Sequence, residues 1–282
     1  MKISKRSLVG IVGGMGKTGS QFATLFHSRG FSVTVTGLAT QDRNDALIAD
    51  ADILIFALPL SHAADLMAEM LKNARRKNQL ILDVSSLKVR EVEAMLTSKG
   101  EVIGMHPLFG PTTDPKGERI ILCPVRASAA TVASLRKVLG AMGLRTIVMS
   151  PKEHDDLMAT VQVVPHLKSL LMSDVLRASG VDLKKILNLC TPTYEMEFNV
   201  IARFLDDHPD LYMPIVFRNP KTSSILRRMR MLIDEYIRIA EHHDLALAEK
   251  RYRSCQDFFK PHLKRARRHS DACIQTLLTL TR

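Results

Sequence analysis

The residue best placed for chemistry in this sequence is a histidine at the end of a short apolar run. His106 follows Val102–Met105, which is typical of a buried strand, and Pro107 comes directly after it. Proline fixes its own φ and pushes the preceding residue towards extended geometry, so a stiff loop is expected to hold the imidazole. Because a neutral histidine can accept a proton near pH 7, we predict that His106 is catalytic. The alternative is a histidine that only caps a strand.

Polar side chains also interrupt the first helical pattern after residue 150. Gln162 and His166 are four residues apart and so share one face of a helix. Pro165 lies between them and is expected to kink the helix, because it has no N–H to donate to the preceding turn. His166 is compatible with a binding role or with an ordinary position in a helical core.

An arginine in the next helical pattern raises the same question. Arg203 lies seven residues after Met196 and three after Val200, which predicts that its stem lies on an apolar stripe. A guanidinium in such a place needs a partner, because an unpaired buried charge is costly. Glu195 or Asp206 would serve, and so would the carboxylate of a bound ligand, which arginine contacts in a two-pronged manner.

A glycine-rich loop near the N-terminus predicts dinucleotide binding. The apolar run Leu8–Val12 leads into glycines at positions 14, 16 and 19 and then into a helical pattern. Between a strand and a helix, G-x-G-x-x-G allows a tight turn, a close approach to a pyrophosphate and a helix N-terminus aimed at the anion. The residues predicted to bind the cofactor, NAD or NADP, are Gly14, Met15, Gly16, Lys17, Gly19, Leu58 and Pro59.

The end of the second predicted strand leaves the phosphate state of the cofactor open. This strand, Phe31–Val35, is followed by Thr36, Gly37 and Leu38, whereas an acid is usual there when a ribose 2′-hydroxyl is bound. Arg43 is near in sequence and could reach a 2′-phosphate. The sequence alone does not choose between NAD and NADP.

Strand and helix patterns alternate over the first 150 residues. The predicted strands are 8–12, 31–35, 53–57, 80–84, 102–106, 119–123 and 145–149, and the later helices are 61–76, 89–98 and 128–142. Continuous aliphatic strands between amphipathic helices indicate a mostly parallel sheet covered on both faces, with ligands beyond the carboxyl ends of the strands. We predict an α/β fold whose N-terminal, doubly wound Rossmann-type domain covers residues 1–150.

The strand signals stop after Pro151. The remaining sequence predicts helices over about 152–179, 182–206, a short segment near Leu211, 222–243, and 245 to beyond 268. A change from alternation to unbroken helical periodicity marks a domain boundary. We therefore predict a C-terminal all-α domain over residues 151–282.

Composition favours a soluble protein with an anionic partner. The 282 residues carry a formal net charge of +11, which suits nucleic acid or a small polyanionic substrate. The four cysteines show no metal-ligand spacing, and no apolar run is long enough to span a membrane. The N-terminal apolar run is broken by glycines and Lys17, unlike a signal peptide. We expect a cytoplasmic protein without a metal site.

Several motifs, in a consistent order, resemble the prephenate dehydrogenase family, and especially the bacterial form fused to chorismate mutase. The similarity extends from Val9 to about Phe259. Its most specific parts are VGGMG at 12–16, DVSSLK at 83–88, GMHPLFGP at 104–111, His154-Asp155 followed by Gln162 and His166, and TPTYE at 191–195 leading to Arg203 and to Asp210-Leu211-Tyr212.

The resemblance implies an activity and a role for each matching residue. The family oxidatively decarboxylates prephenate to 4-hydroxyphenylpyruvate, with hydride transfer to NAD(P), in tyrosine biosynthesis. By position, His106 would act on the ring hydroxyl of the substrate, and Ser86 would orient that hydroxyl and the histidine. A homodimer formed through the helical domain is also implied. The residues expected to bind the substrate are Arg203, which would hold a carboxylate, His166, Lys88 and Gln162.

Departures from the family and rival functions stay open at this point. Gly37 stands where the related bacterial form has an acid, and no mutase segment is expected before Met1. Arogenate dehydrogenase is an alternative, since arogenate differs by an amine in place of a keto group. A β-hydroxyacid dehydrogenase is disfavoured, because that class relies on a helical lysine. A non-catalytic nucleotide-sensing or nucleic-acid-binding function is disfavoured, because it would give no role to His106, Ser86 and Arg203.

Overall fold

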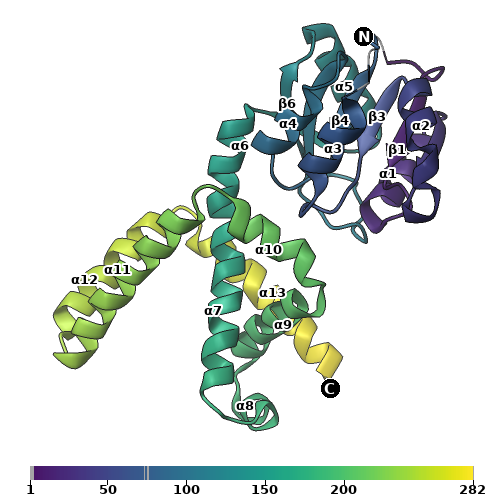
Figure 1. The fold of residues 1–282 in the computed structure, drawn as a ribbon. Helices are drawn as coiled ribbons and strands as arrows, with labels where there is room; N and C mark the ends of the chain where they lie inside the picture. Colours follow the sequence, from purple (N-terminus) through teal and green to yellow (C-terminus); the bar gives the residue numbers. More distant parts are fainter. Residues whose placement is uncertain (1–2, 73, 75, 282) are drawn as a thin grey trace. The chain divides into compact units, whose positions relative to one another are not determined.

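A computed structural model describes residues 3–72, 74 and 76–281 of the protein (Figure 1). The chain forms two compact units. The first comprises Met1–Val161 and Asp210–Asn219, and the second comprises Gln162–Pro209 and Pro220–Arg282. This division falls later than the boundary near residue 150 that the change of pattern predicts, and one later segment belongs to the first unit. The boundary at 150 stays a prediction about the folding domains.

The first unit is built on a seven-stranded sheet in the order β2-β1-β3-β4-β5-β6-β7. Neighbouring strands run parallel, except that β5 and β6 are antiparallel. The predicted mostly parallel sheet is therefore confirmed. The strands are β1 (Leu8–Val12), β2 (Ser32–Thr36), β3 (Ile53–Phe56), β4 (Leu80–Asp83), β5 (Glu101–Pro107), β6 (Arg119–Arg126) and β7 (Arg145–Val148).

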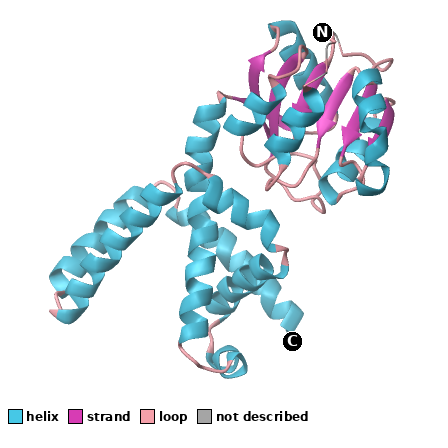
Figure 2. Cartoon of the chain, in the orientation of Figure 1, coloured by secondary structure: helices cyan, strands magenta, loops and turns pink. Residues whose placement is uncertain are grey.

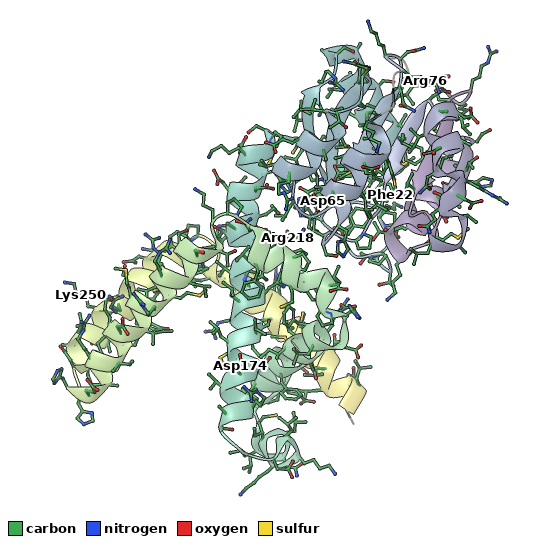
Figure 3. The ribbon with its side chains drawn as sticks, in the orientation of Figure 1. Phe22, Asp65, Arg76, Asp174, Arg218 and Lys250 are labelled. Atoms are coloured by element: carbon green, nitrogen blue, oxygen red, sulfur yellow. The ribbon has the colours of Figure 1, made fainter. Side chains whose placement is uncertain are left out.

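Helices cover both faces of this sheet, as Figure 2 shows in cyan and magenta. The helices α1 (Lys17–His27) and α5 (Ala129–Ala141) share one buried cluster with the strands, and Phe22 of α1 is fully buried in it (Figure 3). Side chains on the opposite face of the strands pack against a second set of helices, which are α2 (Asn44–Asp50), α3 (Ala63–Leu71) and α4 (Val89–Met95).

Burial on both faces explains the aliphatic strands. All residues of β3 and β4 are buried, including Asp83 at the end of β4, because each face of a covered parallel sheet meets a helix. The first unit also contains η1 (Leu38–Arg43), α6 (Pro151–Met158) and α10 (Pro209–Arg218). Helix α6 begins where Ser150 caps it by accepting from the backbone N–H of Glu153, with Pro151 in the first turn.

The second unit is helical, as predicted, but its helices are shorter than the sequence suggests. A π-helical turn, η2 (Ala159–Val163), interrupts the first predicted helix just before Pro165, which cannot donate a backbone hydrogen bond. The second is divided where Thr191 caps a new helix that starts at Pro192. The resulting helices are α7 (Val164–Ala178), α8 (Leu183–Leu189), α9 (Pro192–Asp206), α11 (Thr222–Glu241), α12 (Leu245–Phe259) and α13 (Leu263–Thr281).

Two packing arrangements organise this unit. Helix α7 packs against α9, which also contacts α13, whereas α11 and α12 form a helical hairpin (Figure 1). His166 of α7 stacks on Phe204 of α9 with ring centroids 5.6 Å apart. Within the described residues, no helix is both long and apolar enough to cross a membrane.

Candidate active site

A cavity of about 760 Å³ lies at the carboxyl ends of β1 to β4 in the first unit. The glycine loop forms one wall of this cavity, and the segments after β2, β3 and β4 form others. Leu66 and Met70 of α3 and Asp210 and Leu211 of α10 also line it. Such a position at the carboxyl edge of a parallel sheet is where nucleotides bind. Of the predicted cofactor-binding residues, those that line the cavity are Met15, Gly16, Lys17, Gly19, Leu58 and Pro59.

The glycines of the loop have different tasks. Gly13 turns the chain with φ +79°, and a Cβ there would lie 2.3 Å from the carbonyl oxygen of Ala57. A Cβ on Gly14 would lie 2.6 Å from Cβ of Val35, so this glycine lets the loop pack on β2 and does not line the cavity. A Cβ on Gly16 would meet only a backbone oxygen at 3.4 Å. The second glycine of the motif therefore faces the cavity, and direct contact of Gly14 with a cofactor stays a prediction.

The loop leads into a helix that is oriented for an anion. Helix α1 begins at Lys17 directly after Gly16, and no acidic residue lies in its first turn. Lys17 and Thr18 both line the cavity. Free backbone N–H groups at a helix N-terminus and an adjacent lysine favour a bound phosphate. The residues present thus fit the pyrophosphate of a dinucleotide.

A chain of three buried side chains includes the predicted catalytic histidine. His106 lies at the carboxyl end of β5, is 2% exposed, and its Nδ1 is 2.8 Å from Nε2 of His154 in α6. Nδ1 of His154 is in turn 2.7 Å from Oδ1 of Asp155. His154, the partner of His106, lies 48 residues further along the chain, and Asp155 follows it in the same helix turn.

Asp155 is fixed by three further hydrogen bonds. Its Oδ1 accepts from the backbone N–H of Lys88 at 2.9 Å and its Oδ2 from that of Val89 at 3.0 Å. These N–H groups lie at the start of α4, where a carboxylate also interacts favourably with the helix dipole. The side-chain amide of Asn219 donates to the backbone carbonyl of Asp155 at 2.9 Å. Asp155 therefore joins α6 to α4 while it orients His154.

This hydrogen-bond chain determines which nitrogen carries each proton. The carboxylate of Asp155 accepts, so His154 donates from Nδ1 and presents an unprotonated Nε2. His106 must then donate from its Nδ1 to that nitrogen, which leaves the lone pair on its own Nε2. Burial lowers the pKa of His106 well below its usual 6.5, and the nearby His154 and Lys88 lower it further. His106 is thus a neutral imidazole whose Nε2 can accept a proton.

Burial also keeps His154 neutral. It lowers the pKa of His154 below the usual value, and this effect outweighs the opposing hydrogen bond to Asp155. A neutral His154 presents a lone pair to His106, whereas a charged one would repel the proton on Nδ1 of His106. The two histidines therefore act as one oriented unit.

Lys88, a predicted substrate-binding residue, is enclosed in the protein. Its side chain is fully buried, its Nζ forms an ion pair with Asp83, and it donates to the carbonyl oxygen of Met105 at 2.7 Å. Asp83 also accepts from the backbone N–H groups of Ser85 at 2.9 Å and Met105 at 3.3 Å. These contacts join the ends of β4 and β5, beside His106.

The other predicted site residues divide between the two units. Ser86 lines the cavity at the end of β4, in the same unit as His106. Gln162 and His166 belong to the second unit, where the stacking of His166 on Phe204 brings its helix next to that of Arg203. Burial lowers the pKa of His166, so this imidazole is also favoured in its neutral form.

The predicted apolar environment of Arg203 is wrong. Arg203 is exposed, and Val200, which was expected to share its stripe, is 54% exposed. The buried positions of α9 are instead Ile201 and Phe204. The i+3 spacing from Val200 placed the residue on a face that the helix does not bury. An exposed guanidinium needs no partner within the fold, and Arg203 is available to a ligand.

Sequence reasoning assigned no task to four of the residues that organise the site. His154 and Asp155 entered only as a motif, because nothing in a sequence shows that they lie beside His106. Asp83 ends an apolar strand, and Glu91 follows one turn after Lys88. A charged residue within such an apolar run is the feature of the sequence that could have indicated a role in the site. Among the described residues, no group of three or more His, Cys, Asp or Glu side chains could hold a metal ion.

Two models of known protein families match the chain. The nucleotide-binding domain of prephenate dehydrogenase matches residues 24–148, and the dimerization domain of prephenate dehydrogenase matches residues 150–260. The chain belongs to the prephenate dehydrogenase family. The resemblance seen in the motifs is thus confirmed, and with it the dinucleotide-binding fold of the first unit.

Individual relatives agree with this assignment. The chain is 26% identical over 257 residues to the T-protein of Enterobacter agglomerans, covering 90% of this chain and 68% of that protein. It is 26% identical over 289 residues to a probable arogenate/prephenate dehydrogenase of Methanocaldococcus jannaschii, covering 95% of this chain and 65% of that protein. The chain therefore spans about two thirds of the length of these relatives.

Solved structures show the same fold. The prephenate dehydrogenase of Aquifex aeolicus, in complex with hydroxyphenyl propionate and NAD+, is similar with a TM-score of 0.69 and 18% identity, over 97% of this chain and 100% of that chain. Synechocystis arogenate dehydrogenase is similar with a TM-score of 0.63 and 19% identity, over 84% and 93%.

The buried carboxyl of Glu91 generates a prediction about stability. Burial raises the pKa of Glu91 to about 7, against the opposing charge of Lys88, and Oε2 has no hydrogen-bond partner among the described residues. The folded state therefore holds this proton more tightly than the unfolded state, and stability should fall as the pH rises from about 4.5 to about 7. Glu91→Gln should remove this loss and stabilise the protein at pH 8 by on the order of 2 kcal/mol.

Denaturant unfolding across this pH range measures the effect. Glu93→Gln is the matched control, because Glu93 is exposed on the same helix and should leave the pH dependence as in the wild type. An unchanged pH dependence in Glu91→Gln would show that Glu91 is not the titrating group.

Proposed function

We propose that the protein is a NAD(P)-dependent prephenate dehydrogenase that converts prephenate to 4-hydroxyphenylpyruvate and carbon dioxide. The observation that carries the proposal is a neutral His106, oriented by His154 and Asp155, at the end of the strand next to the dinucleotide cavity. The family and the fold support the same reaction class. The net charge of +11 favours the approach of a dianionic substrate.

The driving force of the reaction lies in the substrate. Prephenate carries a ring hydroxyl, a ring carboxylate and a pyruvyl side chain, and loss of the ring carboxylate with oxidation of the carbinol carbon makes the ring aromatic. The bound cofactor supplies the two-electron oxidant. The protein must orient the substrate and accept the hydroxyl proton, and general-base help of this kind is typically worth roughly 10²–10⁴-fold in rate.

His106 is the proposed base. Its Nε2 lone pair accepts the hydroxyl proton as hydride leaves the carbinol carbon, and His106 returns that proton to the ring oxygen once the loss of carbon dioxide has made the ring aromatic. Its Nδ1–H remains bonded to His154 throughout. The carboxylate of Asp155, one residue further along the chain of hydrogen bonds, stabilises the positive charge that develops on the imidazole. His154 and Asp155 are thus positioning residues, because they act through His106.

The remaining predicted site residues have separate proposed tasks. Ser86 lines the cavity beside β5 and would orient the substrate hydroxyl. We reassign Lys88 from substrate binding to positioning, because Asp83 and Met105 already occupy its ammonium group. The residues of the second unit that we propose to bind the substrate are Arg203, which would hold a carboxylate, His166 and Gln162.

Arogenate is a second candidate substrate. One relative is named for both activities and one similar structure is an arogenate dehydrogenase. The two substrates share the ring that becomes aromatic, so the same base serves both. Formation of the reduced nicotinamide should be assayed with prephenate and with arogenate, each with NAD and with NADP. Turnover of prephenate is expected; turnover of arogenate alone would replace the proposed substrate, and no turnover of either would refute the function.

His106→Asn separates catalysis from binding. Asparagine keeps polarity but cannot accept the proton, so kcat should fall by at least about 10²-fold with little change in KM. Arg203→Ala should instead mainly raise KM, because it removes contact with a charge that is present throughout the reaction. Steady-state kinetics measure both. An unchanged kcat in His106→Asn would remove this residue from the mechanism.

We also propose that the protein is a homodimer formed through the second unit. The matching dimerization domain supports this. In addition, α11 and α12 expose a set of large apolar side chains, and monomeric proteins rarely expose so much apolar surface in one place. These side chains are Met231, Ile233, Tyr236 and Ile237 on α11, and Tyr252, Phe258 and Phe259 on α12. A second copy of the chain would cover them.

Light scattering at micromolar concentration should therefore give the mass of a dimer. Ile233→Lys introduces a charge among these apolar side chains and should shift the mass towards a monomer. Lys250→Glu on α12, which reverses a charge without altering an apolar side chain, should remain dimeric (Figure 3). A monomeric wild-type protein would contradict the proposal.

A further inference from the structure

Two buried oxygen atoms beside the dinucleotide cavity lack hydrogen-bond partners in the part of the chain that the structure describes. Thr36 ends β2 and is 2% exposed, and Asn44 begins α2 and is 7% exposed. Within the described residues, neither Oγ1 of Thr36 nor Oδ1 of Asn44 meets a partner. Both residues line the cavity. Leaving a buried acceptor without a donor costs free energy, so such atoms indicate a group that arrives with a ligand.

The fold does not use the oxygen of Asn44. An asparagine at the start of a helix usually accepts a hydrogen bond from a backbone N–H of the first turn. Oδ1 of Asn44 accepts none, and α2 has no side-chain cap. A capping role therefore does not explain this buried side chain.

The segment that lines the cavity after β2 carries no charged side chain among the described lining residues. Gly37 occupies the position where an acid is usual, and a Cβ there would lie 2.8 Å from Sδ of Met15, so the side chain of Met15 fills that space. The other described residues that line the cavity after β2 are uncharged, namely Leu38, Ala39 and Gln41. Arg43 is exposed and is not among the lining residues.

Among the described residues that line the cavity, the one cation, Lys17, lies in another part of it. Lys17 lies at the start of α1, next to Gly16, where the pyrophosphate is expected. In this fold the adenosine ribose lies at the end of the second strand, which is the place of Thr36, and Asn44 at the start of α2 lines the same cavity. A ribose hydroxyl has a proton to donate to the oxygen of Asn44. A 2′-phosphate has none at neutral pH and would meet an acceptor instead of a cation.

We propose that Asn44 takes the place of the missing acid: its Oδ1 accepts a hydrogen bond from the adenosine ribose 2′-hydroxyl, in the cavity that Thr36 also lines, and so selects NAD over NADP. This inference rests on the proposed cofactor but not on the identity of the substrate. It makes Asn44 a residue that determines cofactor specificity.

Calorimetric binding of NAD and NADP to the full chain tests this inference without turnover. The wild-type protein should bind NAD at least about tenfold more tightly than NADP, and Asn44→Leu should weaken NAD about tenfold while changing NADP much less, as expected for the loss of one hydrogen bond between neutral groups. Asn44→Asp keeps the acceptor and should retain NAD while weakening NADP further, because a carboxylate repels the 2′-phosphate.

Controls separate the inference from the proposed function. Arg43→Ala should leave both affinities unchanged, and thermal melting should establish that each variant is folded. Tighter binding of NADP than of NAD, or an Asn44→Leu variant that loses both dinucleotides equally, would overturn the role of Asn44 and leave the dehydrogenase assignment intact. Failure to bind either dinucleotide would overturn the cofactor assignment as well. Binding of NAD without turnover of prephenate would refute the proposed substrate alone.

Discussion

The first unit depends on the carboxylate of Asp155. Its two oxygens accept from the backbone N–H groups of Lys88 and Val89, which the start of α4 would otherwise leave without partners, and one oxygen also orients His154. One side chain therefore fixes the start of a helix, the position of α6 and the proton positions of two histidines. The start of α4 and the orientation of the histidines at the end of β5 therefore share this one carboxylate.

A second buried charge pair supports the same edge of the sheet. Lys88 and Asp83 are both fully buried, and their hydrogen bonds to Met105 and Ser85 tie the ends of β4 and β5 together. Such a pair costs desolvation and is a poor source of stability on its own. Its value lies in geometry, since it places His106 and Ser86 at the ends of neighbouring strands and adds a positive charge that keeps His106 neutral.

The sequence predicts the sheet and the glycine loop well, because both depend on local signals. Continuous aliphatic runs predicted all seven strands of the sheet. The order of an apolar strand, a glycine-rich loop and a helix predicted the wall of the dinucleotide cavity that this loop forms. Contacts between distant segments were not predictable: His154 is 48 residues from His106, and its role follows from packing. Helix ends set by caps and prolines, such as Thr191-Pro192, were missed because the apolar periodicity continues across them.

The catalytic base and the ribose site show the same physical logic. In each, the fold presents an acceptor to a ligand hydroxyl: the tautomer of His106 carries its lone pair on Nε2, and Oδ1 of Asn44 has no partner within the described residues. The proposed substrate-binding residues of the second unit, including the exposed Arg203, would then supply charge complementarity to a dianion.

The most direct test of the central claim is the ¹⁵N NMR spectrum of the His106 side chain at pH 7. Neutral imidazole with a protonated Nδ1 and an unprotonated Nε2 is predicted, and this state should persist well below pH 6.5. A spectrum that shows the proton on Nε2, or an imidazolium at pH 7, would contradict the account, because His106 would then have no lone pair for the substrate.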